Sequence, residues 1–94
     1  MRNYKTYYIV VKKEFVPVQG KPVKLKGFED FQFFAHKSGK YWQICEATTG
    51  LLVSSTSAKT LAETIASTLA RLDLYKVTKT SMADIIGLNK KAPI

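Results

Sequence analysis

The chain has very few residues of the kinds that cross-link small domains or bind metals. It contains one cysteine, Cys45, so an intrachain disulfide is excluded. A small domain without disulfides suits a reducing cytosol, and we expect a cytoplasmic location. One cysteine and one histidine, His36, are too few for a four-ligand zinc site, and the acidic residues form no calcium-loop pattern. The sequence therefore predicts no metal and no cofactor.

Glycine and long apolar runs are also scarce. The five glycines are scattered, and none belongs to a phosphate-loop or dinucleotide-binding fingerprint. No apolar run approaches the ~20 residues of a membrane span. The first residues lack the apolar segment of a signal peptide. We expect a single domain, residues 1–94, that does not associate with a membrane.

Acidic residues are in the minority, seven against fifteen lysines and arginines, which gives a formal net charge of +8. Such an excess favours an anionic partner, either nucleic acid or an acidic protein. Thirteen of the fifteen cations are lysines, which suit diffuse attraction to phosphates better than the reading of base edges. The alternative is that lysine only keeps a small domain in solution.

The apolar pattern of the first third predicts a strand over residues 4–15, which are rich in Tyr, Ile and Val. Pro17 would end this strand or mark an edge position. A turn over residues 18–21, where Gly20 accepts positive φ, would return the chain along residues 22–28. The alternative for this region is one strand followed by a long basic loop.

A second hairpin is predicted around Ser38 and Gly39, with His36 paired to Tyr41. Because side chains alternate along a strand, two faces follow from this pairing. The predicted core face holds Phe31, Phe33, Ala35, Trp42 and Ile44, and the other face holds Gln32, Phe34, His36, Tyr41, Gln43 and Cys45. A tight turn at Thr49 and Gly50, which requires positive φ at Gly50, adds a third strand.

A helix is predicted after these strands, with Ser57 as its N-cap and a capping box from Thr60 to Glu63. Its apolar positions recur at helical spacing, and three alanines line the flank: Ala58, Leu61, Ile65, Leu69 and Leu72, with Ala62, Ala66 and Ala70. A second capping box at Ser81 opens a short helix that ends near Gly87, before a frayed basic tail.

Together these elements predict an α+β fold. We expect a mostly antiparallel sheet of four to five strands, arranged as a meander of hairpins. One long helix in the second half of the chain packs against this sheet, and a short final helix follows.

Catalytic residues are not expected. His36 is the one side chain with an ordinary pKa near neutrality, and more often such a histidine is a surface residue beside a turn. Glu46 falls on the strand face opposite His36 and Tyr41, so a ribonuclease-like triad fails on geometry. Cys45 lies in an apolar strand and is interpreted as a packing residue. We therefore expect that the protein is not an enzyme.

Nucleic-acid binding has the best functional case, because a sheet that exposes aromatic residues beside lysines can stack bases and neutralise phosphates. The predicted binding residues are Phe34, His36, Lys37, Lys40, Tyr41, Lys12, Lys13, Lys24 and Lys26. The alternative is that the N-terminal strand, the last helix or a second subunit covers these aromatic residues. The chain would then be a protein-interaction module, such as a small inhibitor or assembly adaptor, dimeric through an exposed edge strand.

Residues 33–72 carry a resemblance to small proteins of phages and mobile elements. The matching residues are His36, Trp42, Glu46, Thr49, Gly50, Ser57, Ala58, Lys59, Leu61 and Ala62. The order of three strands and a helix is also similar to the arm-type DNA-binding domains of tyrosine recombinases, which place a three-stranded sheet against DNA. The resemblance implies a DNA-binding role for a phage-encoded or mobile-element-encoded protein, without recombinase activity.

Overall fold

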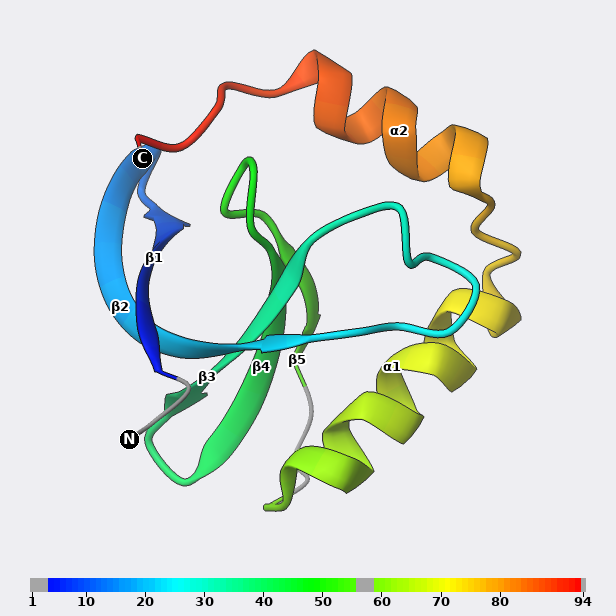
Figure 1. Cartoon of the computed structure of the whole chain (residues 1–94), viewed down its shortest axis with the longest axis horizontal. Coiled ribbons are helices and arrows are strands. Elements are labelled where there is room, and N and C mark those ends of the chain that lie inside the picture. The colour runs from blue at the N-terminus through cyan, green and yellow to red at the C-terminus, as the bar shows by residue number, and fades with distance from the viewer. Residues whose placement is uncertain (1–3, 56–58, 94) are drawn as a thin grey trace.

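The computed structural model describes residues 4–55 and 59–93, and shows one antiparallel sheet with two helices (Figure 1). The strands follow one another across the sheet in chain order. This arrangement confirms the predicted α+β fold class. No helix among the described residues is long and apolar enough to cross a membrane. The elements are β1 (Lys5–Val11), β2 (Glu14–Val23), β3 (Phe33–Ser38), β4 (Tyr41–Glu46), β5 (Leu52–Ser55), α1 (Leu61–Leu74) and α2 (Lys79–Leu88).

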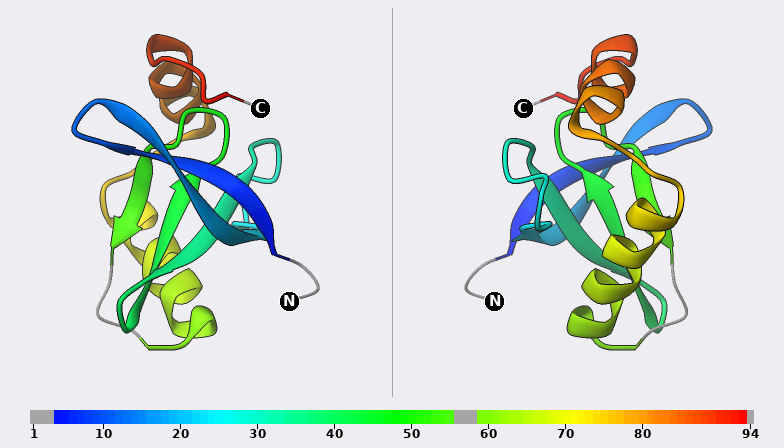
Figure 2. Two further views of the ribbon diagram at one scale, coloured as in Figure 1. Left: turned by 90° about the vertical axis from the view of Figure 1, so that its left-hand side faces the viewer. Right: turned by 90° about the vertical axis from the view of Figure 1, so that its right-hand side faces the viewer.

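Strand β2 is shared between two pairings, and the sheet folds over where one pairing gives way to the other. It pairs with β1 from Glu14 to Gly20, and with β3 only from Lys21 onward. A β-carbon at Gly20 would lie 2.8 Å from the carbonyl oxygen of Ala35, which is closer than such atoms pack. Glycine at this point therefore lets the β1–β2 hairpin fold over β3, and the hairpin crosses the rest of the sheet in Figure 2.

The turn of the first hairpin lies at Lys12 and Lys13, not at residues 18–21 as the sequence suggested. Both lysines have positive φ, 52° and 68°. Pro17 lies inside β2 opposite Tyr8 and does not end a strand. The expectation of a hairpin within the first 28 residues is confirmed, but its predicted turn is wrong, because two lysines carry none of the usual turn chemistry.

The β3–β4 hairpin closes through a two-residue loop in which Gly39 has a φ of 66°. His36 pairs with Gln43 and Tyr41 with Ser38, so the predicted pairing of His36 with Tyr41 is wrong by two residues. Because a shift of two residues leaves the alternation unchanged, the predicted division into two faces holds.

The core lies between one face of the sheet and the two helices, with α1 packed against β4 and β5. Trp42 is buried there, as the sequence predicted. Removing such large side chains from water is the main source of stability for a domain of this size. The core residues are Val23, Leu25, Phe28, Phe33, Ala35, Trp42, Ile44, Leu72 and Met82.

The predicted apolar stripe of α1 packs against the core, but the buried flank beside it differs from the prediction. Thr64 and Thr68 are buried against the sheet. The Thr68 hydroxyl donates a 2.7 Å hydrogen bond to the Thr64 carbonyl oxygen, so its polar atom is satisfied inside the core. The alanines expected along the packed flank are exposed: Ala62, Ala66 and Ala70. The hydroxyl of Thr60 caps the helix, and the cap predicted at Ser57 lies outside the described residues.

Helix α2 begins earlier than predicted, because Thr78 is its N-cap and forms a capping box with Ser81. The segment after α2 returns along the top of the molecule in Figure 1 to the β1–β2 hairpin. There the Ala92 N–H donates a 2.7 Å hydrogen bond to the Thr48 carbonyl oxygen, and Ala92 is buried. The interpretation of this segment as a frayed tail is therefore wrong.

Candidate nucleic-acid interface

Phe34 is fully buried, so the expectation that it stacks bases from an exposed sheet face is wrong. The β1–β2 hairpin covers it, and the ring of Tyr7 stacks on the Phe34 ring with 4.3 Å between centroids and 4° between planes. The stack forms across β2, where Gly20 has no side chain to separate the two rings. The sequence analysis also offered the alternative that the N-terminal strand covers this face. For Phe34, the structure confirms that alternative.

His36 is also buried, on the same covered face as Phe34. Burial lowers the pKa of the His36 imidazole, and hydrogen bonds with the Lys37 backbone and the Gln43 side chain raise it by a smaller amount. Its Nε2 atom has no hydrogen-bond partner among the described residues. A neutral, buried imidazole cannot contact phosphates or bases from solution, so the predicted exposure of His36 is wrong.

Cys45 and Glu46 have structural roles. Burial raises the pKa of the Cys45 thiol to about 12, so the thiolate that a nucleophile requires does not form near neutral pH. The buried Glu46 carboxylate accepts hydrogen bonds from the Thr48 N–H at 2.9 Å, and from the Thr49 N–H and hydroxyl at 2.8 and 2.7 Å. These bonds fix the loop before β5. Glu46 faces away from His36, as the sequence predicted.

The predicted lysines do not form one surface. Lys37 and Lys40 flank the β3–β4 turn at the lower end of Figure 1, where the Lys37 ammonium lies 5.6 Å from the centroid of the Trp42 ring. Tyr41 is beside them and 38% exposed. Lys12 lies in the β1–β2 turn, near the opposite end of the same view.

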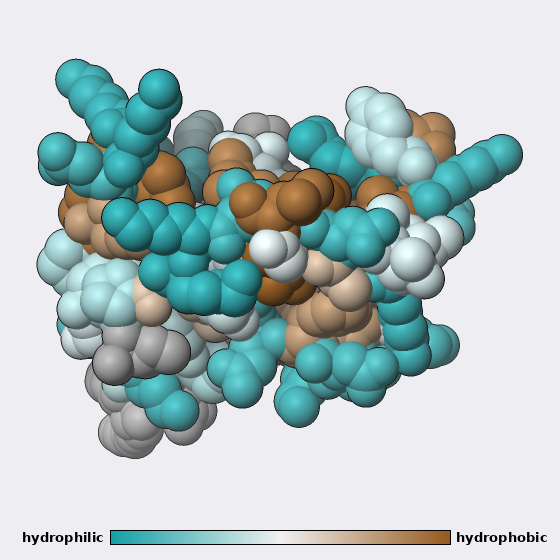
Figure 3. All heavy atoms as spheres, turned by 90° about the horizontal axis from the view of Figure 1, so that it is seen from above, coloured by the Kyte–Doolittle hydropathy of each residue, from teal (hydrophilic) through white to brown (hydrophobic). Residues whose placement is uncertain are grey.

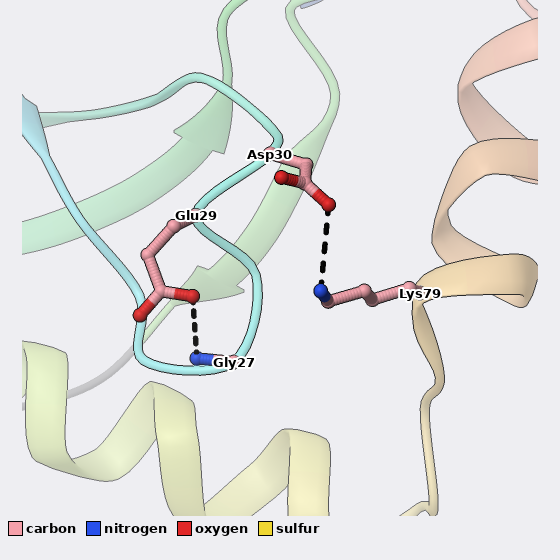
Figure 4. Close-up of polar contacts among 4 residues, drawn as sticks. All are labelled: Gly27, Glu29, Asp30 and Lys79. Carbon is pink, nitrogen blue, oxygen red and sulfur yellow. Dashed lines mark hydrogen bonds and ion pairs between the residues drawn. The ribbon is translucent and has the colours of Figure 1, made fainter.

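Lys24 and Lys26 precede a loop that carries two acidic side chains (Figure 4). The Glu29 carboxylate accepts a 3.0 Å hydrogen bond from the Gly27 N–H, and hydrogen bonds from the backbone hold the pKa of Glu29 below its usual value. Asp30 lies 3.4 Å from the ammonium of Lys79. This loop places two carboxylates beside its lysines, whereas the β1–β2 turn has one adjacent carboxylate, that of Glu14.

The β1–β2 turn brings several cationic side chains to one end of the molecule. Lys12 and Lys13 are exposed in the turn, and Lys90 from the segment after α2 joins them. Lys13 and Lys90 line a cleft of about 110 Å³ between hairpin and segment. We call these three lysines the basic end. Figure 3 looks down on this side of the molecule, where long hydrophilic side chains extend beyond hydrophobic ones.

The basic end also exposes apolar side chains on the hairpin. Val10, Val11 and Val16 are 38%, 43% and 37% exposed. Sequence reasoning did not assign these valines or Lys90 to a site. The available signal was the run of β-branched residues on both sides of Lys12 and Lys13, which is typical of two strands flanking a two-residue turn.

No group of acidic, histidine or cysteine side chains within residues 4–55 and 59–93 is arranged to hold a metal ion. Comparisons of the chain with protein-family models, with curated proteins and with solved structures gave no match.

Proposed function

We propose that this protein is a small non-enzymatic module that binds the phosphate backbone of nucleic acid through the basic end. The observation that carries the proposal is the conformation of the β1–β2 turn. Both central residues, Lys12 and Lys13, have positive φ. A turn of this kind favours Asn-Gly, because glycine and asparagine tolerate the left-handed region.

A non-glycine residue in that region costs roughly 1–3 kcal/mol. Within residues 4–55 and 59–93, the side chains of Lys12 and Lys13 make no hydrogen bond or ion pair that would offset this cost, and both are exposed. The two lysines therefore stabilise the fold less than Asn-Gly would. Their contribution is positive charge at the tip of a hairpin, next to the positive charge of Lys90. Such a group of ammonium ions attracts the phosphates of nucleic acid.

The experiment is a polarisation titration of labelled oligonucleotides at several salt concentrations. Replacing Lys12→Gln together with Lys13→Gln should reduce the slope of log affinity against log salt by about 2 on duplex DNA, since each phosphate contact contributes about 0.9. Lys37→Gln together with Lys40→Gln is the matched control, because it removes the same charge from the opposite hairpin. Equal effects of the two double variants, or no binding at low salt, would contradict the proposal.

A second candidate is the binding of an acidic protein strand along the open edge of β5. The favouring observation is that Leu52 is 54% exposed beside an apolar cleft of about 270 Å³, which Met82 and Ile86 of α2 also line. An extended peptide of alternating valine and glutamate would pair with the edge and complement the net charge of +8. Such a peptide should bind the native protein and lose affinity on Leu52→Lys, and equal binding to both would exclude this candidate.

A further inference from the structure

We infer that the β1–β2 hairpin enters the major groove of duplex DNA as a two-stranded ribbon, which makes B-form DNA the preferred nucleic acid. The inference rests on the proposed function and names its ligand. Over the span where β2 pairs with β1, from Glu14 to Gly20, the register includes no third strand. The major groove, about 12 Å wide, admits a two-stranded β-ribbon. The tip of the hairpin stands out from the body of the molecule in Figure 2.

The side chains near the tip suit the floor of the groove. Val11 pairs directly with Glu14, and Val16 lies two residues further along the same face. Valine methyl groups can contact the methyl group of thymine, and a carboxylate can accept a hydrogen bond from the amino group of cytosine. All three side chains are exposed to solvent in the free protein. A groove would cover apolar surface that the fold itself leaves open.

In this arrangement the lysines of the basic end would contact the phosphates that border the groove. Lys12 and Lys13 lie at the turn, and Lys90 reaches the hairpin from a different segment. The base of the hairpin is held in place, because Gly50 packs so closely that a β-carbon there would lie 2.6 Å from the Tyr8 carbonyl oxygen. A hairpin held at its base loses little conformational freedom on binding.

Other nucleic acids fit this surface less well. Single strands are usually bound by exposed aromatic side chains on which bases stack. Here Phe34 is buried beneath Tyr7, and Tyr41, which is partly exposed, belongs to the other hairpin. Duplex RNA has a deep, narrow major groove that side chains cannot read. The expected order of affinity is therefore duplex DNA, then single-stranded DNA, then duplex RNA.

The test compares binding of the full chain to one sequence in three forms: duplex DNA, single-stranded DNA and duplex RNA. We expect duplex DNA to bind at least about tenfold more tightly than duplex RNA, because the major groove of B-form DNA admits the ribbon and that of duplex RNA does not. Methyl green, which occupies the major groove, should displace the protein, and netropsin, which occupies the minor groove, should not.

A paired variant separates groove contact from charge. Val11→Thr together with Val16→Thr keeps the charge and the β-branched shape but replaces methyl groups with hydroxyls. It should weaken duplex DNA binding several-fold, leave single-strand binding unchanged and preserve the salt slope. Thermal melting of this variant serves as the folding control, and Val10→Thr is a second variant on the other face of the ribbon, expected to have less effect.

The outcomes distinguish the two proposals. No binding to any of the three nucleic acids would overturn the proposed function and this inference with it. Equal binding to all three, with displacement by netropsin, would overturn the groove contact and leave phosphate binding by the basic end standing.

Discussion

The two hairpins of this protein have the same kind of connection and opposite surroundings. The β3–β4 hairpin has both faces covered, so that Phe33, on the core face, and Phe34, on the other face, are both buried. Its two-residue loop uses Gly39 where φ is positive. The β1–β2 hairpin exposes valines near its tip and places lysine at both positive-φ positions.

This difference indicates a division of roles. In β3–β4, burial and turn chemistry both stabilise the fold. In β1–β2, the turn opposes stability and adds charge, and strained positions of this kind are concentrated at functional sites. If the proposed function is correct, the β1–β2 turn serves binding and the β3–β4 hairpin serves folding.

The largest expected effect follows from deleting the main core side chain of β4. Trp42→Ala should lower the free energy of unfolding by about 3–5 kcal/mol, because it removes a buried indole and leaves a cavity. Val16→Ala in the exposed hairpin should cost less than about 1 kcal/mol. Urea denaturation measures the loss of stability in each variant. Similar midpoints for the two variants would contradict the assignment of different roles to the two hairpins.

A smaller effect is expected at Gly50, which lies between β4 and β5 and packs against β1. Gly50 has a φ of 75°, as predicted for a tight turn, and a β-carbon there would also meet the Tyr8 carbonyl oxygen. Gly50→Ala should cost more than about 2 kcal/mol. Gly27→Ala is the control, because Gly27 has a φ of 90° with open space around it. The control should cost only about 1 kcal/mol, and equal losses of melting temperature would show that contact with β1 contributes nothing.

Relieving the β1–β2 turn should raise stability. Lys12→Asn together with Lys13→Gly supplies the sequence that this turn favours, and should increase the free energy of unfolding by about 1 kcal/mol. The same variant should bind nucleic acid more weakly, because two charges are gone. Chemical denaturation and polarisation titration on one preparation test both statements. A variant that is less stable than the native protein would contradict the assignment of strain to the two lysines.

The smallest expected effect concerns pH and the covered face of β3. The folded-state pKa of His36 lies below its ordinary value of 6.5, so the unfolded chain binds the proton more readily than the folded one. At pH values well above the ordinary pKa, the imidazole is neutral in both the folded and the unfolded state, so its ionisation does not affect stability. As pH falls below the ordinary pKa, stability should decrease until the folded-state pKa is passed. Hydrogen bonds with Lys37 and Gln43 offset part of the shift, which keeps the effect small.

Melting temperatures of the native protein and of His36→Gln between pH 7.5 and 5, a range chosen around the ordinary histidine pKa of roughly 6.5, test this expectation. The native protein should lose more stability over that range than the variant does. Parallel profiles would show that His36 is not the group responsible.

The fold class, the β3–β4 hairpin, the helix after it and the positive φ at Gly50 could all be predicted from sequence. Each depends on local rules: alternation in strands, helical spacing and the freedom of glycine. The faces of β3 and β4 were also predictable, because side chains alternate along a strand and a shift of two residues leaves each side chain on the same face. Phe33, Ala35 and Trp42 lie together on the core face as expected. The apolar stripe of α1 was predictable from its helical spacing and packs against the core, but the flank beside it was not, because threonines are buried there and the alanines are exposed.

The candidate site was decided by tertiary structure. Nothing in the local pattern shows that β2 turns at Gly20 and carries Tyr7 over Phe34, yet this contact removes Phe34 and His36 from the surface. Likewise, only folding brings Lys90 to the hairpin that holds Lys13. The sequence by itself determined the positive charge, the strands and the helices, because these depend on composition and on near neighbours. Which aromatic residues are covered, and which lysines meet, depends on contacts between distant segments.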